Sequence, residues 1–526
     1  MTLLSWTLGL ALSGWAHALA MAWPWPAIPL LGVEAGEPVP WLQWVALTML
    51  AWGLRQQTSA ARAAWVAWWF GTAWLAGTFW WLFVSMHRYG GLSAGLSVAA
   101  VWALAAALSL YVAAAGAWAW RWRTAGPWGY AAVWASVWLL AEWARATWFT
   151  GFPWGAAGYA HVDSMAVWAP WVGVYGLGAI SAALAGWWAA GGWRRRGPAR
   201  MLAAVALLPM AWPALAVWLA ALQPSLTTPV GVLPVALLQG NIPQNEKFEP
   251  GAGVPLALSW YPSATRQALE RLDAQGGGLV VAPETALPLL PSEMDPAWWT
   301  QWLQAIADSR SAVMVGLPLG DSQQGYSNSV AAWTPTLEMY RYDKHHLVPF
   351  GEFVPPLFRW FTQRLQMPLG DFARGPLGQP PLLWAGQRIA PHICYEDLFG
   401  EELAVSFRRA DLAPTVLVNV SNIAWFGNTV AIDQHRHISR MRALELQRPL
   451  VRSTNTGSTV LIDHRGQVIS ELPRLTRDVL YGQVEGRAGI TPYAWWVSRW
   501  GLWPWVLLAL GTLAVFEWRR RDRAPD

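Results

Sequence analysis

The chain has 526 residues, of which 55% are apolar and only 13% are charged, whereas a soluble globular domain carries about 25% charged residues. That deficit excludes an ordinary soluble protein, and the single cysteine excludes an intrachain disulfide. The net charge of +5 does not indicate nucleic-acid binding, because many of the arginines flank apolar segments, where they orient membrane helices.

The charge is distributed unevenly along the chain. Residues 1–222 are long stretches rich in Ala, Leu, Val and Trp, whereas residues 223–500 have the composition of a soluble domain. We therefore predict a transmembrane bundle of about seven spans (1–222), a soluble domain (223–500), and a C-terminal span with a basic tail (501–526). Because a span takes about 20 apolar residues, the candidate spans are 3–23, 41–54, 62–84, 92–120, 128–148, 166–190, 200–221 and 502–518.

The flanks of these spans predict the topology. Segment 3–23 lacks the basic stretch of a secretory signal, so we expect a retained helix. Cytoplasmic loops are enriched in Lys and Arg, and one set of loop ends carries most of the arginines, which places both termini in the cytoplasm and residues 223–500 on the opposite side. These arginines are Arg55, Arg62, Arg121, Arg123, Arg194, Arg195, Arg196, Arg200, Arg519, Arg520, Arg521 and Arg523.

The fifth span ends at a segment interrupted by Gly and Pro, Gly151–Gly155. Irregular backbone at membrane depth is tolerated only against protein or a cavity. Trp154, inside this segment, is therefore a candidate for lining a route by which a lipid enters. An ordinary turn explains the segment equally well, and most of the other tryptophans fit the preference of that side chain for the membrane–water interface.

From residue 232 onward, short β-rich runs alternate with helix-like stretches. Continuous apolar runs suit strands that are buried on both faces, and strands interleaved with helices predict an α/β layered domain. The expected strands are Val232–Gln239, Leu279–Ala282, Ala312–Leu317, Asn328–Trp333, Arg388–Cys394, Thr415–Val420, Leu450–Thr454 and Ser458–Ile462. The expected helices are 259–274, 296–309, 397–409 and 429–448, and residues 472–500 are expected to lead back to the last span.

Cys394 is the candidate nucleophile. A thiolate is a strong nucleophile, but a free thiol needs a base or a positive neighbour to form one at neutral pH. A lone cysteine is usually a small buried apolar residue. Cys394, however, ends an apolar strand and is followed by polar residues, and α/β folds expose reactive groups at the carboxyl ends of strands. The residue by itself fits either role.

Glu284 and Lys344 also follow β-like runs. Elsewhere such a glutamate is a solvated loop residue or a helix cap, and such a lysine is a surface charge. In a site, Glu284 would take the thiol proton if partial burial raised its pKa, and the Lys344 ammonium would stabilise an oxyanion. Together with Cys394 they occupy three strand ends, which this type of fold brings together, so the pattern predicts an acyl-transfer site.

In this order and in these local sequences, Glu284, Lys344 and Cys394 resemble the Glu-Lys-Cys triad of the nitrilase (carbon–nitrogen hydrolase) superfamily. Longer strings resemble its membrane branch, the apolipoprotein N-acyltransferases, and the resemblance extends over essentially the whole chain. These strings are Gln239–Gln244, Tyr342–Glu352, Ile393–Glu396 and Ala424–Gly427.

The resemblance implies a polytopic helical bundle of about eight spans and an α-β-β-α sandwich on the periplasmic side of a bacterial inner membrane. It also implies a ping-pong reaction. Cys394 would attack the sn-1 ester of a phospholipid such as phosphatidylethanolamine, and the resulting thioester would pass its acyl chain to the N-terminal amine of a diacylglyceryl-cysteine lipoprotein. Glu284 would serve as base and then acid, while Lys344 and backbone amides near Cys394 would hold the oxyanion.

The same resemblance implies supporting and substrate-binding residues. Glu352 is expected to orient Lys344 or to assist proton transfer, and Tyr395 and Glu396 flank the nucleophile. The substrate-binding candidates are Phe248, Trp425, Phe426 and Trp154. The segment Trp425–Gly427 is the candidate lid that keeps water from the thioester, although aromatic packing explains it equally well.

Two positions depart from the family pattern. Phe248 stands where relatives often carry Trp, and Ile423 where many carry an acid. Both departures concern loop contacts and acyl-chain recognition rather than the triad.

We expect no metal and no other cofactor. His435 and His437 are two positions apart, so they cannot share one face of a helix, and no Cys/His spacing resembles a zinc site. The expected partners are a phospholipid acyl donor, a diacylglyceryl lipoprotein acceptor and the lipid bilayer, with no nucleic acid, and the protein is expected to be a monomer.

Two other functions stay open. One is a membrane-tethered nitrilase-type amidase, in which water takes the acyl group. The other is a lipid-binding or transport protein with an idle outer domain. Transport requires ionisable residues along a membrane pathway, and Glu142 is almost the only one that the predicted spans supply.

Overall fold

The computed structural model describes residues 2–191, 222, 225–321, 323, 325–354 and 372–522. These residues form two compact units. The helical unit comprises the described residues of Met1–Phe83, Ser93–Pro224 and Trp500–Asp526. The α/β unit comprises those of Val84–Leu92 and Ser225–Arg499, so it includes a short segment from the N-terminal half of the sequence.

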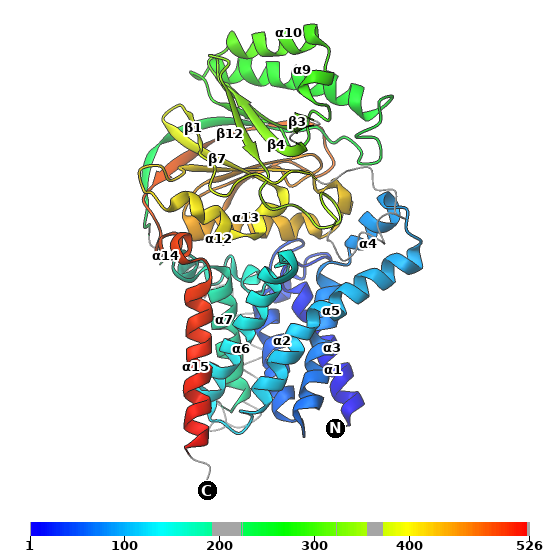
Figure 1. Cartoon of the computed structure of the whole chain (residues 1–526), viewed down its shortest axis with the longest axis vertical. Coiled ribbons are helices and arrows are strands. Elements are labelled where there is room, and N and C mark those ends of the chain that lie inside the picture. Colours follow the sequence, from blue (N-terminus) through cyan, green and yellow to red (C-terminus); the bar gives the residue numbers. More distant parts are fainter. Residues whose placement is uncertain are drawn as a thin grey trace. The chain divides into compact units, whose positions relative to one another are not determined.

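The helical unit is built from the long apolar runs of the sequence. Several helices begin at a hydroxyl side chain that accepts a hydrogen bond from a free backbone N–H of the first turn, such as Ser59 and Ser93. Figure 1 shows the helices running side by side, with α3 packed on α1 and α5, and α6 packed on α7 and α15. The helices are α1 (Leu3–Leu19), α2 (Pro40–Arg55), α3 (Ala60–Thr78), α5 (Ala94–Trp120), α6 (Pro127–Thr147), α7 (Ala169–Ala189) and α15 (Trp503–Arg521).

Few of these helices are long and apolar enough to cross a membrane by themselves. In the described part of the chain two helices meet that condition, α5 and the segment Ala166–Ala189 that contains α7. The pair α14 (Pro492–Trp500) and α15 meets it only as one span bent by 86°. The helices α1 and α2 have 17 and 16 residues, which is less than the roughly 20 that a straight span takes. The prediction of about eight spans is therefore not confirmed, and predicted span 200–221 lies outside the described residues.

The α/β unit contains two six-stranded sheets, with the strand orders β12-β1-β2-β3-β4-β5 and β11-β10-β9-β8-β7-β6. Each sheet has three parallel strands at its centre, β1-β2-β3 and β7-β8-β9, and antiparallel strands outside them. The strands are β1 (Thr228–Gln239), β2 (Leu279–Val281), β3 (Ala312–Asp321), β4 (Gly325–Trp333), β5 (Met339–Asp343), β6 (Leu382–Trp384), β7 (Gln387–Ile393), β8 (Val416–Ser421), β9 (Leu450–Thr454), β10 (Val460–Ile462), β11 (Val468–Glu471) and β12 (Asp478–Ala488).

Two apolar cores hold the layers of the α/β unit together. One lies between the sheets and joins residues such as Leu237 of β1 to Val418 of β8. The other lies between the first sheet and α9 (Gly253–Asp273) and α10 (Pro296–Ala307). In Figure 1 these two helices cover one outer face, and α12 (Gly400–Leu403) and α13 (Ala431–Leu446) cover the other. The α-β-β-α sandwich that the resemblance implied is confirmed.

The expected strands and three of the four expected helices of this unit are confirmed to within a few residues. The expected helix 397–409 is wrong, because the chain leaves the helical region at Phe399 and forms only α12 between two short 3₁₀ turns. Residues 472–500 lead to the last helix, as expected, but they also form β12 and α14, which were not predicted. As an edge strand paired with β1, β12 has buried residues scattered among exposed and partly buried ones, and it lacks a continuous apolar run.

Candidate active site

Cys394 occupies the first position after β7, in a sharp turn of the chain. Its φ of 50° lies in the left-handed region, which residues other than glycine rarely adopt. The side chain is partly exposed. Its carbonyl oxygen accepts hydrogen bonds from His435 Nε2 at 3.2 Å and from Asn419 Nδ2 at 3.4 Å. These bonds offset the backbone strain and hold the thiol at the end of the strand.

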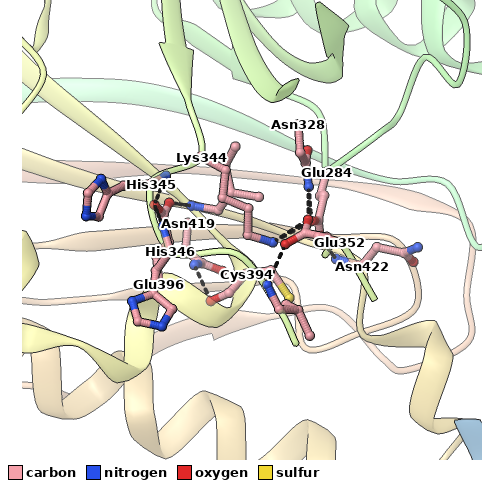
Figure 2. A network of polar contacts seen from close by, with 12 residues as sticks. Glu284, Asn328, Lys344, His345, His346, Glu352, Cys394, Glu396, Asn419 and Asn422 are labelled. Carbon is pink, nitrogen blue, oxygen red and sulfur yellow. Dashed lines mark hydrogen bonds and ion pairs between the residues drawn. The ribbon is translucent and has the colours of Figure 1, made fainter. Parts of the chain in front are cut away.

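Lys344 follows β5 and is held between two carboxylates. Its Nζ lies 2.9 Å from Glu352 Oε1 and 3.3 Å from Glu284 Oε1, and the residue is only 1% exposed. Burial alone would lower the pKa of Lys344, but the two carboxylates outweigh burial and raise it. Lys344 is therefore a permanent cation, and Figure 2 shows its amine pointing at the carboxylates, with Cys394 beside this group.

Glu284 lies just beyond β2 and is buried, with 7% of its surface exposed. Its Oε1 accepts from Asn328 Nδ2 at 2.7 Å, and its Oε2 accepts from the backbone N–H of Asn422 at 2.8 Å. Burial would raise the pKa of Glu284, but the charge of Lys344 and these hydrogen bonds lower it overall. The raised pKa that we set as a condition for Glu284 to act as a base is not found, because the sequence does not show that a buried cation faces this carboxylate.

The pKa of the Cys394 thiol shifts in the opposite direction from that of Glu284. Burial and the charge of Glu284 raise the pKa of Cys394 to about 12, although Lys344 acts in the other direction. At neutral pH the free site thus holds a neutral thiol next to an ionised carboxylate. Glu284 can therefore accept the thiol proton as a general base, and that transfer has to accompany attack on the substrate because the pKa of the thiol is the higher of the two.

Glu352 contacts Lys344, which leaves both of its expected roles open. Its Oε2 accepts from the backbone N–H of Val348 at 2.8 Å, which fixes the carboxylate, and its Oε1 binds Lys344. Asn328 Nδ2 also donates to this Oε1, at 2.6 Å, so the amide bridges Glu284 and Glu352. Sequence reasoning missed Asn328, and the available signal was a polar residue at the start of a predicted buried strand. We call Glu284, Lys344, Glu352 and Asn328 the acid–lysine cluster.

Glu396 joins the lysine-bearing loop to the nucleophile turn. Its Oε2 accepts from the backbone N–H of Ile393 at 2.6 Å, and its Oε1 accepts from that of His345 at 2.7 Å. The Tyr342 hydroxyl donates to the same carboxylate at 3.0 Å. Tyr395, the other flanking candidate, is buried and packs its ring against its aromatic neighbours. Both flanking positions therefore support the turn, and Glu396 does so by binding both segments.

Three of the four substrate-binding candidates, Phe248, Trp425 and Phe426, belong to the α/β unit. Phe248 is 42% exposed, Trp425 is partly buried with its ring 5.7 Å from that of Tyr89, and Phe426 is partly buried. Ile423, which departs from the family pattern, is fully buried. Contact of these residues with a substrate stays a prediction.

Trp154 belongs to the helical unit, where it is only 3% exposed and packs against Trp81 at 4.7 Å. Its segment is irregular, as predicted, and the Arg145 side chain donates to the carbonyl of Trp154 at 2.8 Å. Glu142 Oε1 accepts from the backbone N–H of Ala157 at 2.7 Å. Buried side chains thus satisfy the irregular backbone here, in line with the general requirement.

A second group of buried polar residues, which sequence reasoning did not identify, surrounds Asp397. His392 Nε2 lies 2.5 Å from Asp397 Oδ1, Arg452 Nη1 lies 3.3 Å from Oδ2, and Ser439 also donates to Oδ2. Burial would raise the pKa of Asp397, but the contact with His392 and the charge of Arg452 hold it well below its usual range. We call Asp397, His392, Ser439, Arg452 and His435 the carbonyl network.

This network reaches Cys394 through His435. Arg452 Nη2 donates to His435 Nδ1 at 2.9 Å, so Nδ1 is the accepting nitrogen and Nε2 carries the hydrogen that is donated to the Cys394 carbonyl. Burial and Arg452 lower the pKa of His435 well below its usual value, so the ring is neutral. His437, two positions further along the same helix, contacts Arg440, a residue outside this network, at 3.3 Å. Among the described residues, no three His, Cys, Asp or Glu side chains are placed to hold a metal ion.

Comparison with known proteins covers both halves of the chain. The family model for the apolipoprotein N-acyltransferase N-terminal domain matches residues 35–187, and that for carbon-nitrogen hydrolases matches residues 234–493. The apolipoprotein N-acyltransferase of Verminephrobacter eiseniae is 51% identical over 95% of this chain and 94% of its own length. That of Ralstonia nicotianae is 44% identical over 92% and 90%. A solved CN-hydrolase superfamily protein from Xanthomonas campestris is 21% identical, with a TM-score of 0.33 over 49% of this chain and 91% of that one.

Proposed function

The chain belongs to the apolipoprotein N-acyltransferase family, and from this premise we propose that it transfers an acyl chain from a phospholipid to the N-terminal amine of a diacylglyceryl-cysteine lipoprotein. The observation that carries the proposal is the arrangement of the site. A buried lysine is fixed between two carboxylates beside the chain's one thiol, which stands at a strained turn after a strand.

In the first half-reaction Cys394 attacks the sn-1 ester carbonyl of a phospholipid such as phosphatidylethanolamine. The thiol proton passes to Glu284, and the new C–S bond forms as the carbonyl oxygen becomes an oxyanion. The fixed ammonium of Lys344, with backbone N–H groups near Cys394, stabilises that charge. The ester C–O bond then breaks, Glu284 returns the proton to the leaving oxygen, and a lysophospholipid departs from the thioester.

In the second half-reaction the acceptor amine attacks the thioester carbonyl. The C–N bond forms, the C–S bond breaks, and Glu284 transfers a proton from the nitrogen to the departing sulfur. An amide is more stable than an ester, which gives the sequence its direction. Water must be kept from the thioester, and we propose that Trp425 and Phe426 form part of the lid that does so.

We further propose that the helical unit holds the enzyme in a bacterial inner membrane, crossing it about eight times. In this topology both termini are cytoplasmic and the α/β unit is periplasmic, where it works as a monomer. The arginines at one set of loop ends support this orientation. Reporter fusions at residue 300 and at the C-terminus should fall on opposite sides of the membrane, and signals from one side would contradict the topology.

The reaction is tested with purified full-length protein and phosphatidylethanolamine labelled in its sn-1 chain. We expect a mass increase of one acyl chain on Cys394 and its transfer to a synthetic diacylglyceryl-cysteine lipopeptide when the peptide is added. Cys394→Ser should form no thioester. Release of labelled fatty acid at the same rate with and without the lipopeptide would support a membrane-tethered amidase or hydrolase instead.

The transport alternative has little support. The ionisable side chains Glu142 and Arg145 bind main-chain groups of their own unit. Full biological activity of Cys394→Ala would nevertheless favour that alternative.

A further inference from the structure

The chain has 36 lysines and arginines, and only Lys247 and Lys344 are lysines. Both are buried at this site. The two side chains differ in one respect that matters for chemistry: an arginine stays protonated, whereas the pKa of a buried lysine shifts readily. Lys344 cannot use that property, since two carboxylates hold its proton. Lys247 has different surroundings.

Lys247 lies in a segment that is attached to the site at two points. Its Nζ donates to the main-chain carbonyl of Glu284 at 3.0 Å, and the residue is 2% exposed. Three residues earlier, Gln244 Oε1 accepts from the side chain of Asn422 at 2.8 Å, and the backbone N–H of Asn422 binds the Glu284 carboxylate. The segment thus contacts Glu284 directly and through Asn422.

The hydrogen bonding of Lys247 suits an amine that gains and loses a proton. A carbonyl oxygen can accept a hydrogen bond from a neutral amine as well as from an ammonium, whereas a carboxylate adds an ion pair that holds the proton on the nitrogen. Burial lowers the pKa of Lys247 to about 7, although the charges of Glu284 and Cys394 act to raise it. The 3.0 Å contact places the Lys247 amine against the main chain of the residue that carries the general base.

The second half-reaction needs such a group. An α-amine has a pKa of about 7.7–8.0, so the acceptor arrives at neutral pH mainly as an ammonium, which cannot attack. Thioester plus ammonium gives amide, thiol and one free proton. Glu284 carries the proton that ends on the sulfur, and the other proton needs a second acceptor.

We propose that Lys247 is that acceptor: it takes the first proton from the incoming ammonium, directly or through one bridging water, and later releases it to solvent. The freed amine attacks the thioester while Glu284 moves the remaining proton to Cys394. The inference rests on the proposed transfer reaction and assigns the base for its second step. The first half-reaction starts from a thiol and an ester and needs no such base.

The test measures the two half-reactions separately in full-length Lys247→Met and Lys247→Gln. Met removes the amine, whereas Gln keeps an N–H donor for the Glu284 carbonyl but cannot serve as a base. The acceptor is a diacylglyceryl-cysteine lipopeptide at pH 7, where about one amine in ten is unprotonated. In both variants the rate at which the lipopeptide consumes the thioester should therefore fall about tenfold more than the rate at which the thioester forms. At pH 9 the loss should largely disappear. Hydroxylamine, which is uncharged at neutral pH, should remove the acyl group at a rate that the substitutions change no more than they change thioester formation.

Equal losses in both half-reactions, or an equal loss with hydroxylamine, would make Lys247 only a positioning residue for Glu284. Rescue by Gln but not by Met would lead to the same conclusion. Formation of the acyl adduct by the variants also shows that they fold. If the wild-type protein itself forms no adduct, the transfer reaction fails and the role of Lys247 fails with it, whereas wild-type transfer with unaffected variants overturns the role of Lys247 alone.

Discussion

Cys394 interacts with two buried polar groups, the acid–lysine cluster and the carbonyl network. They differ in whether a proton can be transferred within the group. The acid–lysine cluster acts on the sulfur of Cys394, and the carbonyl network binds its main-chain oxygen. Both groups are almost fully buried. In the cluster, an ionised carboxylate faces a neutral thiol, so a proton can move once substrate arrives. In the network, Asp397 is bound by His392, Ser439 and Arg452. These contacts lower its pKa, so the carboxylate stays ionised at ordinary pH values.

The difference shows that burial does not decide the function of a charged residue. Asp397 and Glu284 are both buried carboxylates bound by several donors. They differ in that Glu284 lies beside the Cys394 thiol, whose pKa is higher, so Glu284 can accept a proton whereas Asp397 serves as a scaffold. The network also explains how a residue with positive φ is held in place, since it delivers a neutral His435 N–H to the Cys394 carbonyl. Four substitutions separate the two groups experimentally.

The largest effect is expected from Glu284→Gln in the acid–lysine cluster. Loss of a general base should lower the rate of acyl transfer by about 10²–10⁴-fold. The negative charge that raises the pKa of Cys394 also disappears, so iodoacetamide should alkylate this thiol faster than in wild type at pH 8. A variant that lost both acyl transfer and alkylation would instead point to a collapsed site.

Lys344→Ala should lower turnover by about 10²–10³-fold, as for a missing oxyanion donor. The ammonium also lowers the pKa of Glu284, so without it the pKa of that carboxyl rises and the acid is protonated at higher pH. The residual activity should therefore have its acidic limb at higher pH than wild type. Near-normal turnover, measured as labelled lipopeptide formed per minute, would refute the oxyanion role.

A substitution in the carbonyl network should lower the stability of the fold. Arg452→Met removes one partner of a buried ion pair, which typically costs about 3–5 kcal/mol, and the free energy of unfolding in urea should fall accordingly. Arg409→Met, at an exposed pair with Asp411, is the matched control and should leave the unfolding midpoint unchanged. Equal unfolding curves for both variants would mean that the network does not stabilise the fold.

The smallest effect is the pH dependence of the stability that Asp397 contributes. The pKa of Asp397 is depressed in the folded state, so its contribution to stability is complete above the unfolded value of about 3.9 and is lost as pH falls below it. The stability difference between wild type and Asp397→Asn should thus be the same at pH 6 and pH 9 and should shrink below pH 4. A difference that changes between pH 6 and pH 9 would show that Asp397 exchanges its proton there and belongs with the catalytic groups.

The sequence by itself determined the alternation of apolar strands and amphipathic helices, and it placed Glu284, Lys344 and Cys394 at strand ends. Those features depend on runs of neighbouring residues, as in α9, where Ala257, Tyr261, Ala264, Ala268 and Leu272 share one buried face. Edge strand β12 was missed because only four of its eleven residues are buried and they do not form a continuous apolar run. Helix 397–409 failed because Glu396 and Asp397 bind groups of the preceding strand instead.

Only the tertiary structure decided which charges meet. Asn328 bridges Glu284 and Glu352, Lys247 reaches the Glu284 carbonyl, and Arg452 joins Asp397 to His435. The partners in these contacts lie on separate elements, so no local pattern predicts them. A pKa follows the same rule, because it depends on the charges that packing brings within a few ångströms, and for this reason the net pKa shift of Glu284 is opposite to the one that burial alone predicts.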